Sequence, residues 1–290
     1  MYITNYIVAG HGFQVAHNEE NIDNLLPSYV SFKTTDEINP LFSVTIDDNM
    51  MPSWRGERLG YFPCNSANFE VYRNGESAYQ ILISNEAEIP CAFMQSDEMM
   101  KNIVVTTRGN NAMRSFGLNN AIMLAYTYTS AEHKTLLMHS SVVENAEQGY
   151  MFLGASGRGK STHSDLWVKY INGSCLINDD NPVVRINNDG TPTVYGSPWS
   201  GKRPIYKNVH YPIGGFAAIE QGVQNSIRRE SIPAAFGILL SSCSTMKFDK
   251  RIHISICGTI TNILEKLQVH TLTCRPDEEA AKLSSATLKG

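Results

Sequence analysis

One stretch, GASGRGKST at residues 154–162, restricts the fold more than any other part of the chain. It fits the Walker A pattern G-x-x-x-x-G-K-[ST], with Gly154, Gly159, Lys160 and Ser161 at the fixed positions. The apolar run just before it predicts a buried strand, and the residues after it have the pattern of a helix. The alternative is a strand-to-helix turn with no further role. Because both flanking elements are of the right type, we interpret the stretch as a phosphate-binding loop.

A loop of this kind binds phosphate through its backbone and through the helix that follows. Its glycines let N–H groups curl around an anion, and the helix N-terminus adds unpaired donors and a positive dipole. Lys160 would reach the β- and γ-phosphates, and the Ser161 hydroxyl would ligate Mg²⁺. We therefore expect ATP and Mg²⁺ as cofactors. The expected nucleotide-binding residues are Gly154, Ala155, Ser156, Gly157, Arg158, Gly159, Lys160, Ser161 and Thr162.

Two adjacent carboxylates are candidates for the same site. Asp179 and Asp180 follow the segment CLIN (175–178), whose apolar residues predict a short buried strand. A carboxylate at that position would face the metal and the γ-phosphate, and a second one can take a proton from an attacking hydroxyl. Asn181-Pro182 comes directly afterwards, so a solvated turn is the alternative.

Three further side chains have two interpretations each. His139 lies in the apolar strand before the loop, where it is either a structural residue or a neighbour of the phosphates. Lys202 ends a second glycine-bearing loop, 196–202, and Arg203 follows it. The two either clamp phosphate or an anionic substrate or form a solvated basic pair.

The pattern of the chain changes near residue 112. The earlier residues are rich in strand and turn signals, among them a hairpin around Asn74-Gly75. The residues that follow begin with helical spacing and lead into the glycine loop. We therefore predict a β-rich N-terminal domain, 1–111, and a catalytic domain, 112–290, in a fold of the α/β (α+β) class.

Composition excludes several classes of partner. Lys and Arg total 24 against 28 Asp and Glu, which gives a formal charge of −4 and no basic footprint for nucleic acid. The sequence contains no run of about 20 apolar residues, so it predicts no membrane helix, and the N-terminal residues lack the pattern of a secretory signal.

The six cysteines form no C-x-x-C pair, and scattered cysteines of this kind are typical of buried thiols in a cytoplasmic protein. Asp47-Asp48-Asn49 lacks the rest of a calcium-loop pattern, so it predicts a turn. Homo-oligomerisation stays open.

In their order and spacing, HSSVV (139–143), GASGRGKST (154–162) and INDD (177–180) resemble HPr kinase/phosphorylase and its relatives. GSPWSGK (196–202) is similar to a segment of the broad HPr-kinase-like group. The resemblance covers roughly residues 112–275. It implies the P-loop fold that this family shares with phosphoenolpyruvate carboxykinase, which is a twisted mixed β core with helices around it.

The resemblance also implies roles for single residues. Ser161 and Asp180 would hold Mg²⁺, Asp179 would act as the base toward a serine hydroxyl, and His139 would lie near the γ-phosphate. An acidic residue usually follows GKS in true HPr kinases, whereas this chain has Thr162. The implied activity is an ATP-dependent kinase acting on a hydroxyl, foremost a serine, of a protein, peptide or small molecule. The alternative is a nucleotide-binding regulatory or scaffold protein with little turnover.

Overall fold

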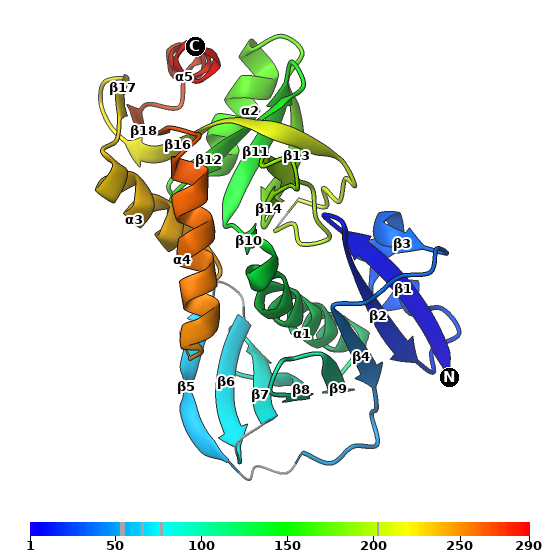
Figure 1. Cartoon of the computed structure of the whole chain (residues 1–290). Coiled ribbons are helices and arrows are strands. Elements are labelled where there is room, and N and C mark those ends of the chain that lie inside the picture. Colours follow the sequence, from blue (N-terminus) through cyan, green and yellow to red (C-terminus); the bar gives the residue numbers. More distant parts are fainter. Residues whose placement is uncertain (53–55, 65–66, 76–77, 202, 247) are drawn as a thin grey trace. The chain divides into compact units, whose positions relative to one another are not determined.

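The structure, a computed structural model, describes residues 1–52, 56–64, 67–75, 78–201, 203–246 and 248–290. These residues form two compact units, Met1–Ser130 and Ala131–Gly290. Each unit is built on its own mixed sheet, and no described strand belongs to both sheets (Figure 1). The predicted mixed α/β class is confirmed in this general form, with two large mixed sheets and few helices.

The described residues of the first unit form one sheet and one α-helix. Its elements are β1 (Tyr2–Val8), β2 (His11–His17), η1 (Ile22–Asn24), η2 (Pro27–Phe32), β3 (Lys33–Thr34), β4 (Phe42–Ile46), β5 (Glu57–Cys64), β6 (Ala67–Asn74), β7 (Ala78–Asn85), β8 (Pro90–Asp97), β9 (Asn102–Thr107) and α1 (Asn111–Ser130). The strand order is β3-β1-β2-β4-β9-β8-β7-β6-β5, in which β4 is parallel to both of its neighbours. Strands β6 and β7 pair antiparallel with Asn74 opposite Ala78, which confirms the predicted hairpin.

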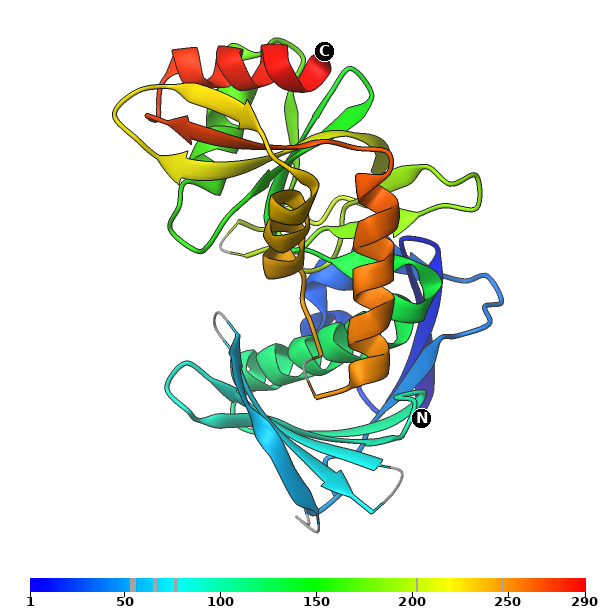
Figure 2. The same ribbon diagram turned by 60° about the vertical axis from the view of Figure 1, so that its left-hand side comes forward.

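The boundary between the units lies at Ser130, whereas the change in sequence pattern predicts one near residue 112. Helix α1 accounts for the difference, because it packs on β4, β7, β8 and β9 of the first unit (Figure 2). At Gly117 the helix approaches the sheet so closely that a Cβ atom would lie 2.7 Å from the backbone oxygen of Cys91. The change in pattern thus marks a change of secondary structure within one folded unit.

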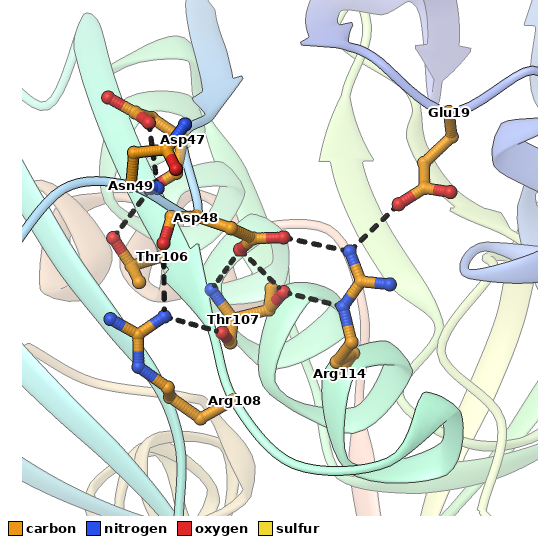
Figure 3. A network of polar contacts seen from close by, with 8 residues as sticks. All are labelled: Glu19, Asp47, Asp48, Asn49, Thr106, Thr107, Arg108 and Arg114. Atoms are coloured by element: carbon orange, nitrogen blue, oxygen red, sulfur yellow. Dashed lines mark hydrogen bonds and ion pairs between the residues drawn. The ribbon is translucent and has the colours of Figure 1, made fainter.

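The acidic turn after β4 is held by side chains of the same unit (Figure 3). Asp48 Oδ1 accepts from the backbone N and the hydroxyl of Thr107, at 2.8 and 2.9 Å. Its Oδ2 lies 2.9 Å from an Arg114 nitrogen that also contacts Glu19 at 2.8 Å. Both oxygens of Asp48 therefore have protein donors, and residues 47–49 form a turn, as predicted.

The second unit carries the glycine-rich loop. Its elements are η3 (Ala131–His133), β10 (Thr135–Leu137), β11 (Ser140–Asn145), β12 (Gln148–Leu153), α2 (Lys160–Tyr170), β13 (Cys175–Asp180), β14 (Val183–Ile186), β15 (Pro192–Tyr195), β16 (His210–Gln221), β17 (Ser226–Arg229), α3 (Ile232–Ser242), α4 (Lys250–Leu264), β18 (Val269–Cys274) and α5 (Glu278–Lys289). The strand order is β10-β14-β15-β16-β12-β11-β13, and β18 pairs with both β16 and β17.

Strand β12 lies inside this sheet, with antiparallel β11 on one side and parallel β16 on the other. It is buried along nearly its whole length, which explains its continuous apolar run. Its Phe152 packs on Trp167 of α2, with the two rings 5.4 Å apart. Helix α5 lies beside α2 and completes this core (Figures 1 and 2). The strand before the loop is therefore held inside the sheet, and the helix after the loop is held by packing against that strand and α5.

Within the described part of the chain, no helix is both long enough and apolar enough to cross a lipid bilayer.

Candidate functional site

The glycine-rich loop connects β12 to α2 through backbone conformations that favour glycine. Gly154, Gly157 and Gly159 have φ angles of 137°, 78° and 102°. Other residues adopt such angles only at a cost, so the three glycines allow the tight bend between strand and helix. Gly159 directly precedes α2, whose first N–H groups have no acceptor within the helix. The loop therefore ends at a helix N-terminus suited to an anion.

Lys160, the first residue of α2, is buried against this loop. Its Nζ donates to the backbone oxygens of Gly154, at 2.9 Å, and of Ala155, at 3.4 Å. The same Nζ lies 2.9 Å from Nε2 of His139. Burial lowers the pKa of Lys160, and the negative charges of Asp180 and Asp179 oppose that shift. The amine is thus held at the base of the loop, within electrostatic range of both carboxylates.

His139 joins this lysine to one of the aspartates. It lies between β10 and β11, where its backbone N donates to Ser242 O at 2.7 Å. A neutral ring that accepts from Lys160 at Nε2 carries its proton on Nδ1. This Nδ1 lies 2.9 Å from Asp180 Oδ1, although the ring N–H points off the line of a hydrogen bond. Lys160, His139 and Asp180 therefore form one contiguous chain.

Asp179 faces a different partner, because successive side chains of a strand point to opposite sides. Strand β13 continues through Asp180, with Ser141 opposite Asp179 on β11, and no turn separates the two aspartates. Asp179 is only 6% exposed, and its Oδ2 lies 3.0 Å from Nε of Arg203. Its Oδ1 is buried without a hydrogen-bond partner among the described residues. An unpaired, buried carboxylate oxygen is costly unless a donor or a cation binds it.

The second glycine-bearing loop is attached to the aspartate strand. The buried amide of Asn178 donates to Ser197 Oγ at 3.2 Å and to Trp199 O at 3.4 Å. A Cβ atom on Gly201 would lie 3.2 Å from Cβ and Cγ of Asp180, so the loop closely approaches that carboxylate. The loop therefore fixes the end of β13 and brings Arg203 to Asp179. Lys202 lies outside the described residues.

The remaining members of the predicted set divide into two groups. Ala155, Ser156, Gly157, Arg158 and Thr162 are exposed on the loop or on the first turn of α2. Ser161 is half-buried, and its backbone oxygen accepts from Arg203 Nη2 at 3.2 Å. The structure thus brings Asp179, Arg203 and the backbone of Ser161 together on one side, and Asp180, His139 and Lys160 on the other.

Buried polar side chains of helix α2 contact a serine of α5. His163 Nε2 and Trp167 Nε1 lie 2.9 and 2.8 Å from the Oγ of Ser284. Burial lowers the pKa of His163 to about 4, so the ring is neutral near pH 7. His163 and Trp167 are both buried and pack between the two helices.

No group of three or more His, Cys, Asp or Glu side chains in the described residues is arranged to hold a metal ion. A metal here would need other ligands, such as phosphate oxygens and the Ser161 hydroxyl. Asp180 and Ser161 are the predicted metal ligands, but both oxygens of Asp180 already have neighbours, His139 and Asn181. The unpaired Oδ1 of Asp179 fits a cation better.

Sequence reasoning missed several residues of the site. Asp165 on α2 forms two contacts with Arg203, at 2.6 and 3.0 Å. Gln221 at the end of β16 donates to Gly157 O at 3.4 Å. Neither residue belongs to a recognisable motif. Asn178 stands next to the Asp-Asp pair, and a buried strand ending in three polar residues was a signal for its role.

No protein-family model matches the chain, and a comparison with curated proteins also finds no match. The geometry of the site is therefore the basis on which a function can be proposed for this chain.

Proposed function

We propose that the chain is an ATP-dependent, Mg²⁺-requiring kinase that transfers the γ-phosphate to a hydroxyl of a protein, peptide or small molecule. The observation that carries this proposal is the position of Lys160. Lys160 starts a helix after a loop of glycines with positive φ angles. Burial lowers its pKa, but the negative charges of both aspartates oppose that shift and so favour the charged amine. This combination supplies a phosphate cradle and acidic groups for a metal and a proton.

The nucleotide would bind along the glycine-rich loop. The unpaired N–H groups at the start of α2 would hold phosphate oxygens, and Lys160 would exchange its contact with Gly154 O for the β- and γ-phosphates. Mg²⁺ bound with ATP supplies charge neutralisation as the phosphoryl group leaves. The Ser161 hydroxyl and the unpaired Asp179 Oδ1 are the groups that fit this ion.

Asp180 is the better candidate for the base. Its side chain is 26% exposed, so an acceptor hydroxyl can reach it, and His139 lies against its other side. It would take the hydroxyl proton as the acceptor oxygen forms its bond to the γ-phosphorus and the bond to ADP breaks. His139 and Lys160 would hold the carboxylate in position. This order of the two aspartates is the reverse of the one that the resemblance implies.

The arrangement of strands supports a relationship to the HPr-kinase-like, carboxykinase-like P-loop fold. The strand that leads into the loop has an antiparallel neighbour, β11, and a parallel one, β16. A mixed core of this kind agrees with the fold that the sequence motifs imply and differs from an all-parallel sheet. We propose this fold for residues 131–290.

Calorimetry with Mg-ATP tests the proposal. Lys160→Ala is expected to weaken binding about 10- to 100-fold, because it removes a charged donor to phosphate. Lys169→Ala removes the same charge from an exposed position on the same helix and is the matched control. Equal affinity of both variants and the wild type, with unchanged melting temperatures, would refute the phosphate cradle.

Turnover then separates a kinase from a nucleotide-binding regulator. ADP release is measured with and without serine-containing peptides and small hydroxyl compounds. Binding of Mg-ATP with no ADP release under any of these conditions would favour the regulatory alternative.

A further inference from the structure

The guanidinium of Arg203 is divided between two carboxylates. Its Nε lies 3.0 Å from Asp179 Oδ2. Its Nη1 and Nη2 donate in parallel to Oδ1 and Oδ2 of Asp165, at 2.6 and 3.0 Å. This second contact is the bidentate geometry by which arginine recognises carboxylate and phosphate.

The two contacts differ in how easily they exchange. The side chain of Asp165 is 60% exposed, whereas that of Asp179 is 6% exposed. An exposed ion pair is screened by salt and contributes little, whereas removing one partner of a buried pair leaves an uncompensated charge. An anion that arrives from solvent can therefore displace Asp165 and leave the contact of Nε with Asp179 intact.

We propose that the Nη1/Nη2 fork of Arg203 is an oxyanion subsite, which Asp165 occupies in the free protein. The inference deepens the proposed kinase function and rests on it. The fork lies beside the first turn of α2, because Nη2 also donates to Ser161 O at 3.2 Å. The subsite therefore adjoins the place where the terminal phosphate would lie.

The ligand of this subsite is a phosphate or carboxylate oxyanion from one of two sources. It is either the γ-phosphate of ATP or an anionic group next to the acceptor hydroxyl. In both cases Asp165 is a specificity-determining residue, because ligands without an oxyanion at this position cannot displace it. Asp179 contacts Nε of the same guanidinium through Oδ2, and its buried, unpaired Oδ1 independently indicates that a ligand or ion completes this region.

The test compares Asp165→Asn with the wild type by calorimetry in three titrations. The first uses Mg-ADP, and the second uses the Mg²⁺ complex of the β,γ-imido analogue of ATP. The third adds inorganic phosphate to protein that is saturated with this analogue. Glu265→Gln removes the same charge from an exposed position at the end of α4 and is the matched control. Arg203→Lys keeps the positive charge but removes the fork.

A γ-phosphate ligand predicts that Asp165→Asn binds the ATP analogue about three- to fivefold more tightly, with unchanged affinity for Mg-ADP. An anionic acceptor predicts unchanged affinity for both nucleotides and a similar gain for phosphate in the third titration. Arg203→Lys is expected to lose at least about tenfold in whichever titration responds. Equal affinities of Asp165→Asn and the wild type in all three would overturn the subsite. Failure of the wild type to bind either nucleotide would overturn the proposed function, and the subsite with it.

Discussion

The buried histidine of α2 makes the stability of the second unit depend on pH. His163 packs edge-on against Phe152 with ring centroids 4.7 Å apart, and burial lowers its pKa from 6.5 to about 4. The folded state therefore holds the neutral ring at pH values where the unfolded chain is already protonated. Stability from this source is fully present above about pH 6.5 and is lost as the pH falls toward 4.

The magnitude follows from the difference between the two pKa values. Each unit of difference corresponds to about 1.4 kcal/mol, so the full loss below pH 4 is about 3 kcal/mol. At pH 5 the unfolded state is nearly fully protonated at this position and the folded state is not, which gives a loss of about 2 kcal/mol. Near pH 7.5 the loss is negligible.

His163→Gln isolates this contribution, because glutamine can still bond to Ser284 but does not titrate. Urea denaturation of both proteins at pH 7.5 and pH 5.0 gives four unfolding free energies. All other titrating groups are common to both proteins, so their effects cancel in the comparison. We expect the wild type to lose about 2 kcal/mol more than the variant between the two pH values. Parallel losses would refute the argument that the folded state excludes the proton.

Four further substitutions test other parts of the structure. Asp180→Asn is expected to bind Mg-ATP almost normally and to lose about 10²- to 10⁴-fold in turnover, whereas Asp179→Asn should also weaken Mg²⁺-dependent binding; the opposite pattern in calorimetry and ADP release would exchange their roles. Gly201→Val should lower turnover, because its side chain would press on Asp180 from 3.2 Å, and a variant with wild-type turnover would contradict that close approach. Arg114→Met should destabilise the first unit by about 1 kcal/mol by leaving Asp48 and Glu19 without their cation, and an unchanged thermal unfolding midpoint would count against the network in Figure 3.

Local patterns predicted the elements around the site. The glycine-rich loop, the buried strand before it and the helix after it follow from apolar periodicity and from the glycine signals. These signals depend on neighbours within a few residues, and a single sequence contains such information. The predicted boundary near residue 112 relied on the same kind of signal, which reports a change of element and carries no information on where α1 packs.

The sequence does not predict which side chains of the site contact one another. Arg203 and Asp165 are far apart in the chain, and neither stands in a motif that would pair them. The Asn181-Pro182 dipeptide indicates a turn, which leaves a solvated turn at the two aspartates as the alternative to a site. Pairing with β11 instead keeps β13 extended through Asp180, and the alternation of side chains then gives the two aspartates different partners.

The parallel pairing of β12 with β16 has a consequence for how the protein folds. The hairpin of β11 and β12 is local, with Asn145 opposite Gln148. By contrast, Leu153 at the entrance of the glycine-rich loop pairs with Ala218, which follows more than sixty residues later. Closing so long a segment is slow, because its entropy must be lost before the pairing is formed. The hairpin should therefore form early, and the loop should take its final shape only when β16 arrives, late in folding.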